Sequence, residues 1–234
     1  MSTITQLFTK NGGCFITPEV QIQEKLSRVK AFVFDWDGVF TNGSKDANLN
    51  SSFNEVDSMG TNLLRFSYFL KHQTLPCTAI ISGEKNSAAF TFVERECFHY
   101  SFSKFANKLE AIHKLCALQN IEPHQIGFVF DDVLDLSLAE ICGIRIFIPR
   151  QANALLTQYV IKHKLADYTT ACEGGNHAVR EAAELLIALQ GNFEEVITKR
   201  KNFDTDYANY LSQRKNTTPQ FFASQNGQII DMPR

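Results

Sequence analysis

Three short apolar runs in this chain each end in side chains that could do chemistry. The runs and their endings are 29–34 before Asp35-Trp36-Asp37, 77–81 before Ser82-Gly83, and 126–130 before Asp131-Asp132. Carboxylates brought together repel one another, so a hard divalent cation is the natural reason for gathering them, and oxygen ligands suit Mg²⁺ better than zinc. Aspartates also follow strands as turn residues or helix caps, an alternative that is stronger for any one ending than for all three together.

The three runs are typical of strands that are buried on both faces, because their apolar residues do not alternate with polar ones. Helical spacing separates them at residues 59–72, 87–96, 108–119, 136–142 and 178–190. This alternation predicts an α/β fold, a doubly wound, Rossmann-like parallel sheet with helices on both faces. Ligands of such sheets bind beyond the carboxyl ends of the strands, so we expect the three polar endings to meet there.

The pattern divides the chain into three predicted parts. Residues 1–28 read as an N-terminal arm, irregular up to residue 17, with Thr17 capping a short helix that has Pro18 at its first position. Residues 29–191 form the main domain. Residues 192–234 form a C-terminal extension, helical over about 193–213 and loose from Lys215. Residues 42–56, rich in Asn, Ser and Gly, predict a small hairpin or loop insert and no large cap domain.

Composition argues against several classes of partner. A net charge of −2 is unlike the basic surplus of nucleic-acid-binding proteins. No apolar run approaches the roughly 20 residues that span a bilayer, and the N-terminus lacks the pattern of a signal peptide. The six cysteines include no C-x-x-C pair, so neither a zinc site nor a disulfide scaffold is expected. We therefore expect a cytoplasmic protein that binds neither nucleic acid nor membrane.

Four segments resemble, in order and spacing, the motifs of the haloacid dehalogenase phosphatases. They are 34–41 (FDWDGVFT), 80–83 (IISG), 107–109 (NKL) and 131–135 (DDVLD). Within that superfamily the likeness is greatest to the 3-deoxy-manno-octulosonate 8-phosphate phosphatases and the nonulosonate 9-phosphate phosphatases. The segments that carry it are 56–60 (VDSMG), 106–109 (ANKL) and 173–181 (EGGNHAVRE), the last similar to G-G-x-G-A-V-R-E.

The resemblance implies a Mg²⁺-dependent phosphoric monoester hydrolase. Asp35 would attack phosphorus and carry the aspartyl-phosphate, while Asp37 would protonate the leaving oxygen and then activate water. Magnesium would be held by the Asp35 carboxylate, by Asp37 through its backbone carbonyl, and by Asp131. The implied substrate is a small phosphorylated keto-sugar acid, an octulosonate or nonulosonate phosphate. Lipopolysaccharide biosynthesis and a homotetramer are further implications.

The remaining implied roles concern phosphate binding and orientation. Ser82, Gly83 and Lys108 would bind the transferring oxygens, with Lys104 as the competing lysine. Asp132 and Asp135 would orient Lys108 and metal-bound water from a second layer. Arg180 would bind the substrate carboxylate from its own or a neighbouring subunit, and an ordinary surface arginine is the alternative.

Three residues adjacent to the motif segments depart from the family pattern. Asn42 replaces an acidic residue, Glu84 replaces an arginine, and Phe130 replaces a glycine. The changes at Glu84 and Phe130 favour a catalytically degenerate phosphatase-like module with a role in assembly or regulation. The enzyme is favoured by the intact Asp35, Asp37, Ser82, Lys108 and Asp131. A phosphoacceptor receiver domain also has acidic strand ends, but it lacks D-x-D-G.

Overall fold

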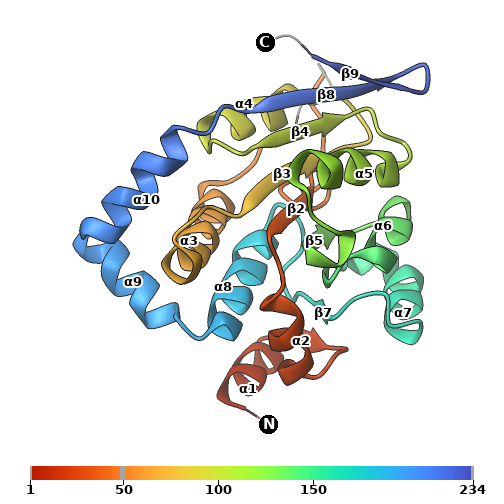
Figure 1. Ribbon diagram of the computed structural model, residues 1–234. Coiled ribbons are helices and arrows are strands. Elements are labelled where there is room, and N and C mark those ends of the chain that lie inside the picture. The colour runs from red at the N-terminus through yellow and green to blue at the C-terminus, as the bar shows by residue number, and fades with distance from the viewer. Residues whose placement is uncertain (1, 48–50, 233–234) are drawn as a thin grey trace.

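The computed structural model describes residues 2–47 and 51–232 of the chain (Figure 1). Within these residues one sheet has the strand order β1-β7-β6-β5-β2-β3-β4-β8-β9. Its strands are β1 (Cys14–Phe15), β2 (Ala31–Asp35), β3 (Cys77–Ile81), β4 (Tyr100–Ser103), β5 (Ile126–Phe130), β6 (Ile144–Phe147), β7 (Tyr168–Thr169), β8 (Gln220–Gln225) and β9 (Gln228–Asp231). Only the outermost pairs, β1 with β7 and β8 with β9, are antiparallel. The predicted parallel α/β sheet is confirmed, with an antiparallel strand added at each edge.

Helices cover both faces of this sheet. They are α1 (Thr3–Lys10), α2 (Glu19–Leu26), α3 (Glu55–His72), α4 (Ser87–Arg95), α5 (Lys108–Gln119), α6 (Leu136–Ile141), α7 (Ala154–Lys162), α8 (Ala178–Gln190), α9 (Phe193–Asn202) and α10 (Thr205–Lys215). Helices α2, α3, α4 and α8 pack on one face, and α5, α6 and α7 pack on the other. Helices α9 and α10 curve around the outside of α3 and lead to β8 (Figure 1).

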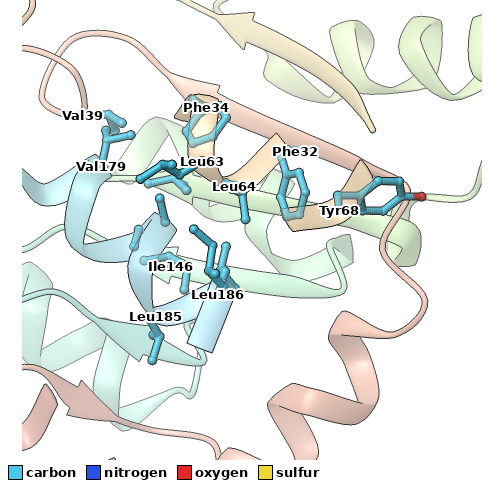
Figure 2. Close-up of a cluster of buried hydrophobic side chains, with 14 of the residues drawn as sticks. Phe32, Phe34, Val39, Leu63, Leu64, Tyr68, Ile146, Val179, Leu185 and Leu186 are labelled. Atoms are coloured by element: carbon cyan, nitrogen blue, oxygen red, sulfur yellow. The ribbon is translucent and has the colours of Figure 1, made fainter. Parts of the chain in front are cut away.

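Alternate residues of β2 belong to two hydrophobic clusters, one on each face of the sheet. Phe32 and Phe34 belong to the cluster under α3 and α8, and Ala31 and Val33 belong to the opposite cluster. Figure 2 shows the first cluster, in which side chains of α3 and α8 converge on β2 and β6. Its labelled members are Phe32, Phe34, Val39, Leu63, Leu64, Tyr68, Ile146, Val179, Leu185 and Leu186. A strand buried in this way on both faces explains the unbroken apolar run in the sequence.

Several predictions for the ends of the chain are wrong. The arm predicted as irregular contains α1, capped by the Ser2 side chain, and β1. Helix α2 has Pro18 at its cap position, and the Thr17 hydroxyl, predicted to be the cap, donates instead to Asp167 Oδ1 at 2.7 Å. The tail predicted to be loose forms β8 and β9. The segment predicted to be helical over about 193–213 is helical, as α9 and α10, which are separated at Phe203, a left-handed residue. Strands β1 and β8 depend on pairing with residues that are distant in the sequence, which local patterns do not reveal.

The insert after β2 leads into α3 without a cap domain among the described residues. Residues 42–47 and 51–54 form neither helix nor strand, and residues 48–50 of the predicted hairpin or loop lie outside the described part of the chain. Helix α3 begins four residues before the predicted start, where the Asn54 side chain accepts the backbone N–H of Asp57. Across residues 2–47 and 51–232, no helix has both the length and the apolar character that a membrane crossing needs.

Candidate active site

The polar endings of β2, β3 and β5 meet in one cavity of about 310 Å³ at the carboxyl edge of the sheet. The three strands are adjacent and parallel, which brings their ends to the same edge. The residues that line the cavity are Asp35, Asp37, Gly43, Ser82, Gly83, Glu84, Lys108, Asp131, Asp132, Leu134, Asp135 and Arg150. Eight of the nine predicted site residues are therefore brought together, and Arg180 is not.

Three buried carboxylates form the centre of this cavity. Asp35, Asp131 and Asp135 each offer an oxygen, and these oxygens lie within 4.8 Å of one another. Burial, followed by the neighbouring Asp35 charge, raises the pKa of Asp131 to about 9 and that of Asp135 to about 6. Asp131 Oδ1 has no hydrogen-bond partner among the described residues. Crowded, buried oxygen donors with an unpartnered lone pair fit a hard divalent cation such as Mg²⁺.

Lys108 provides the positive charge beside this cluster. It is the first residue of α5, whose start is capped by the Asn107 side chain. The Nζ atom lies 2.7 Å from Asp35 Oδ1 and 2.5 Å from Asp135 Oδ1. Burial alone would lower the pKa of Lys108, but the two carboxylates raise it, so the amine stays protonated. The competing lysine, Lys104, is exposed and does not line the cavity.

Asp132 and Asp135 make different contacts, although the resemblance implies the same orienting role for both. Asp135 is buried and contacts Lys108 directly, and its Oδ2 also accepts the backbone N–H of Asp132 at 3.2 Å. The side chain of Asp132 instead accepts the backbone N–H of Val133, where it caps the short turn Val133–Asp135. Of the two, Asp135 is therefore the residue that holds the lysine in place.

Two glycine positions allow the turn after Asp35 to approach the acidic cluster. Gly38 has a φ of +87°, and a Cβ at this position would collide with Asp131 and Arg150. On the far side of the same turn, a Cβ on Gly174 would collide with the carbonyl oxygen of Gly38. The two glycines of the 173–181 segment thus pack against the first motif, since a Cβ on Gly175 would lie 2.5 Å from the Asn42 nitrogen.

Ser82, Gly83 and Glu84 line the cavity where β3 ends. Ser82 is buried, and its Oγ accepts the backbone N–H of Glu84 at 3.3 Å. A Cβ added to Gly83 would meet no atom within 4 Å, so the space beside this glycine is open. Glu84, where the family pattern has arginine, adds a carboxylate to the lining.

Two basic residues that contact aspartates of the site, Arg150 and Lys45, have no role predicted from the sequence. Arg150 forms an ion pair with Asp131, and Lys45 Nζ lies 2.9 Å from Asp37 Oδ2. Arg150 could have been found, because it follows the strand beside β5 and so lies at the same edge of the sheet. Together with Lys108, these residues partly balance the acidic lining.

Arg180 lies away from this cavity in the same chain. Its guanidinium contacts Glu184 Oε1 at 2.7 Å, and it lines a separate cavity of about 430 Å³ between α1 and α8. The motif residues around it contribute to packing. Asp57 Oδ1 accepts the backbone N–H of Arg180 at 2.8 Å, and Glu181 accepts the backbone N–H groups of Ala171 and Cys172.

No protein-family model matches the chain. By sequence, it is 26% identical over 190 residues to 3-deoxy-D-manno-octulosonate 8-phosphate phosphatase KdsC of Escherichia coli BL21, which covers 78% of this chain and 92% of that protein. The corresponding protein of Yersinia pestis is 23% identical over 185 residues, covering 77% of this chain and 91% of that protein.

Solved structures give the same neighbours. The Moraxella catarrhalis 3-deoxy-D-manno-octulosonate 8-phosphate phosphatase, in complex with magnesium, phosphate and KDO, has a TM-score of 0.63 at 26% identity, covering 77% of this chain and 98% of that one. The cobalt-bound Haemophilus influenzae phosphatase YrbI shares the fold, with a TM-score of 0.62 at 22% identity, covering 77% and 99%. In sequence and in structure the chain is thus similar to 3-deoxy-D-manno-octulosonate 8-phosphate phosphatases, at 22–26% identity.

Proposed function

We propose that this protein is a Mg²⁺-dependent phosphomonoesterase that acts on a small phosphorylated keto-sugar acid through an aspartyl-phosphate on Asp35. One observation carries the proposal. The carboxylates of Asp35, Asp131 and Asp135 lie within 4.8 Å of one another, with the buried ammonium of Lys108 between Asp35 and Asp135. Lys108 and Arg150 supply two positive charges for these three carboxylates, so one negative charge is left uncompensated when all three are ionised, and a divalent cation would offset it.

Asp35 and Asp131 would hold the ion through their carboxylates, and Asp37 through its backbone carbonyl. When bound, Mg²⁺ would offset the repulsion between the phosphate and the attacking carboxylate. The unpartnered Oδ1 of Asp131 supports this assignment. Arg150 then has a second use, because a cation at Asp131 would free its guanidinium for an anionic group of the substrate.

The reaction would proceed in two displacements. Asp35 attacks phosphorus while the ester bond breaks, and a proton from the Asp37 carboxyl passes to the departing oxygen. Asp37 then takes a proton from water as the water attacks phosphorus and releases Asp35. The Ser82 hydroxyl and the Lys108 ammonium would bind the transferring oxygens, with Asp135 fixing the lysine.

The substrate class rests on the relatives, which are named for 3-deoxy-D-manno-octulosonate 8-phosphate. The cavity of about 310 Å³ has the size of a small-molecule site. Arg150 and Lys45 are cations of this chain that could bind a substrate carboxylate. Arg180 could take part only in the site of another copy, so its predicted role belongs with the proposal of a homo-oligomer.

A degenerate phosphatase-like module is the second candidate, and Glu84 is the observation that favours it. Its carboxylate lines the cavity where a phosphate would enter. In that case Mg²⁺ could still bind at the acidic cluster, but no phosphoester would turn over. Catalysis is therefore the property that separates the two functions.

The test is hydrolysis of 4-nitrophenyl phosphate and of 3-deoxy-D-manno-octulosonate 8-phosphate, with Mg²⁺ or with EDTA. We expect Mg²⁺-dependent release of phosphate that Asp35→Asn abolishes. Asp206→Asn, a change in the first turn of α10, should leave it unchanged. Absence of activity, or activity that survives Asp35→Asn, would favour the module. Equal turnover of hexose phosphates or nucleotides would overturn the substrate class and leave the phosphatase intact.

A further inference from the structure

The buried hydroxyl of Ser51 contacts Asp37 and belongs to a part of the insert that none of the four motifs includes. Ser51 is 4% exposed and makes three hydrogen bonds. Its Oγ accepts from Trp36 Nε1 at 3.0 Å and from Asn86 Nδ2 at 2.6 Å, and it donates to Asp37 Oδ1 at 3.1 Å. Three segments far apart in the sequence, namely the turn after β2, the insert and the start of α4, therefore meet at one oxygen atom.

The direction of these bonds is fixed by the partners. The indole N–H of Trp36 can only donate. The Asn86 side chain must present its NH₂ group to Ser51, because its Oδ1 already accepts the backbone N–H groups of Ala88 and Ala89 at the cap of α4. A serine hydroxyl has two lone pairs and one proton, and both lone pairs are in use. Its proton is therefore committed to Asp37.

Packing prevents the donors from turning away. Trp36 is fully buried, and its ring stacks on Phe40 at 5.2 Å and lies against Phe53 and Phe92. Asn86 is 1% exposed. Because neither side chain can reorient without leaving a buried polar group unpaired, the network is rigid.

We propose that Ser51 is a positioning residue for Asp37, which selects the carboxyl oxygen that exchanges protons with substrate and water. With Oδ1 engaged as an acceptor, the transferable proton belongs on Oδ2. That oxygen contacts Lys45, a half-exposed side chain of the insert that can leave when substrate enters. As the bond from phosphorus to the ester oxygen breaks and the bond from Asp35 to phosphorus forms, the Oδ2 proton passes to the departing oxygen. In the second displacement Oδ2 takes a proton back from the attacking water.

This inference rests on the proposed phosphatase activity, and leaving-group dependence tests it. A nitrophenolate departs without a proton, whereas a sugar alkoxide needs one, so only the sugar ester depends on Asp37 in the first displacement. The parameter kcat/KM reports that displacement for both esters. We expect Ser51→Ala to lower kcat/KM for the sugar phosphate by about 10- to 100-fold, a part of the 10²–10⁴ that general acid–base catalysis contributes. The value for 4-nitrophenyl phosphate should fall by less than about threefold.

Three further variants sharpen the test. Ser52→Ala changes the neighbouring exposed serine and should alter neither ester. Ser51→Thr keeps the hydroxyl and should restore the sugar phosphate reaction. Ser51→Cys keeps the size but donates weakly, so it should reproduce the selective loss, and it carries the test if Ser51→Ala does not fold.

The outcomes separate this inference from the function on which it rests. A wild-type protein without Asp35-dependent hydrolysis would remove the proposed function. An active wild type whose Ser51→Ala and Ser51→Cys variants lose both esters by the same factor, or lose neither, would overturn the inference alone. Equal loss would mean that Ser51 only holds the insert in place.

Discussion

Replacing Asp131 by asparagine tests whether the acidic cluster is built for a cation. Without a cation, burial and the Asp35 charge raise the pKa of Asp131 from 3.8 to about 9, so at pH 7 the folded protein must keep this carboxyl protonated. The unfolded chain would release that proton. Holding a proton about three pH units above the ordinary pKa costs about 4 kcal/mol, which is a ceiling for this crowded group.

An asparagine at position 131 has no proton to hold, but its buried amide lowers stability in another way. A buried amide with an unsatisfied donor or acceptor costs about 1–3 kcal/mol. The net expectation is that, in EDTA at pH 7, Asp131→Asn is more stable than the wild type by about 2 kcal/mol. For a chain of this size that is about 4–8 °C in Tm.

The raised pKa of Asp131 also determines how the stability difference between Asp131→Asn and the wild type changes with pH. The favourable contribution of Asp131 is fully present below pH 4 and is lost as the pH rises toward 9, so the advantage of Asp131→Asn should shrink at pH 5. Mg²⁺ should remove or reverse the stability advantage of Asp131→Asn over the wild type at pH 7. At one hundred times its Kd, the ion stabilises the wild type by about 2.7 kcal/mol. The variant lacks one of the ligand carboxylates and should gain less.

Thermal unfolding at pH 5 and pH 7, in EDTA and in Mg²⁺, measures all of these differences. Asp132→Asn is the matched control, because this aspartate caps a turn beside the cluster. Asparagine caps such a turn about as well as aspartate, so this change should alter stability by less than about 0.5 kcal/mol with and without Mg²⁺. The reasoning fails if Asp131→Asn is less stable than the wild type in EDTA at pH 7, or if Mg²⁺ stabilises both proteins equally.

Three other changes test separate parts of the site. Lys108→Met leaves the two carboxylates that it bridges without a partner, so it should abolish hydrolysis and cost about 3–5 kcal/mol in denaturant unfolding; unchanged stability would contradict the buried pairing. Gly174→Ala should lower both Tm and activity, because its Cβ collides with the Gly38 carbonyl; wild-type turnover would show that the turn can move freely. Arg150→Gln should bind Mg²⁺ several-fold more tightly by calorimetry, because exchanging the Asp131 proton for a divalent ion adds positive charge beside the Arg150 guanidinium; weaker binding would refute this repulsion.

The sequence predicts the interior of the fold well. Strand β5 and helices α5 and α8 begin and end at the predicted residues. Strands that are buried on both faces leave unbroken apolar runs, and the helix caps have local signals, such as Asn107 before α5. The convergence of Asp35, Ser82 and Asp131 follows from the parallel arrangement and does not require knowledge of side-chain contacts.

The features that were not predicted depend on which strands become neighbours. Strand β8 places Phe221 and Phe222 in the two opposite cores, but its flanking Gln and Ser residues are typical of a loop. Arg150 belongs to the site only because β6 lies beside β5. The contact of Trp36 with Ser51 depends on the path of the insert, which periodicity does not determine.

The pairing of β8 with β4 has a consequence for biosynthesis. On the ribosome, β4 emerges long before β8, and until β8 arrives its backbone groups on that side have no strand to pair with. Such an open edge is a template for misassociation with other nascent chains, and the long connection makes closure slow. Phe102, which stacks on Phe222 at 5.2 Å in the finished protein, would meanwhile be accessible. Chaperone binding or proteolytic clipping is therefore expected to act on this edge, far from the catalytic cavity.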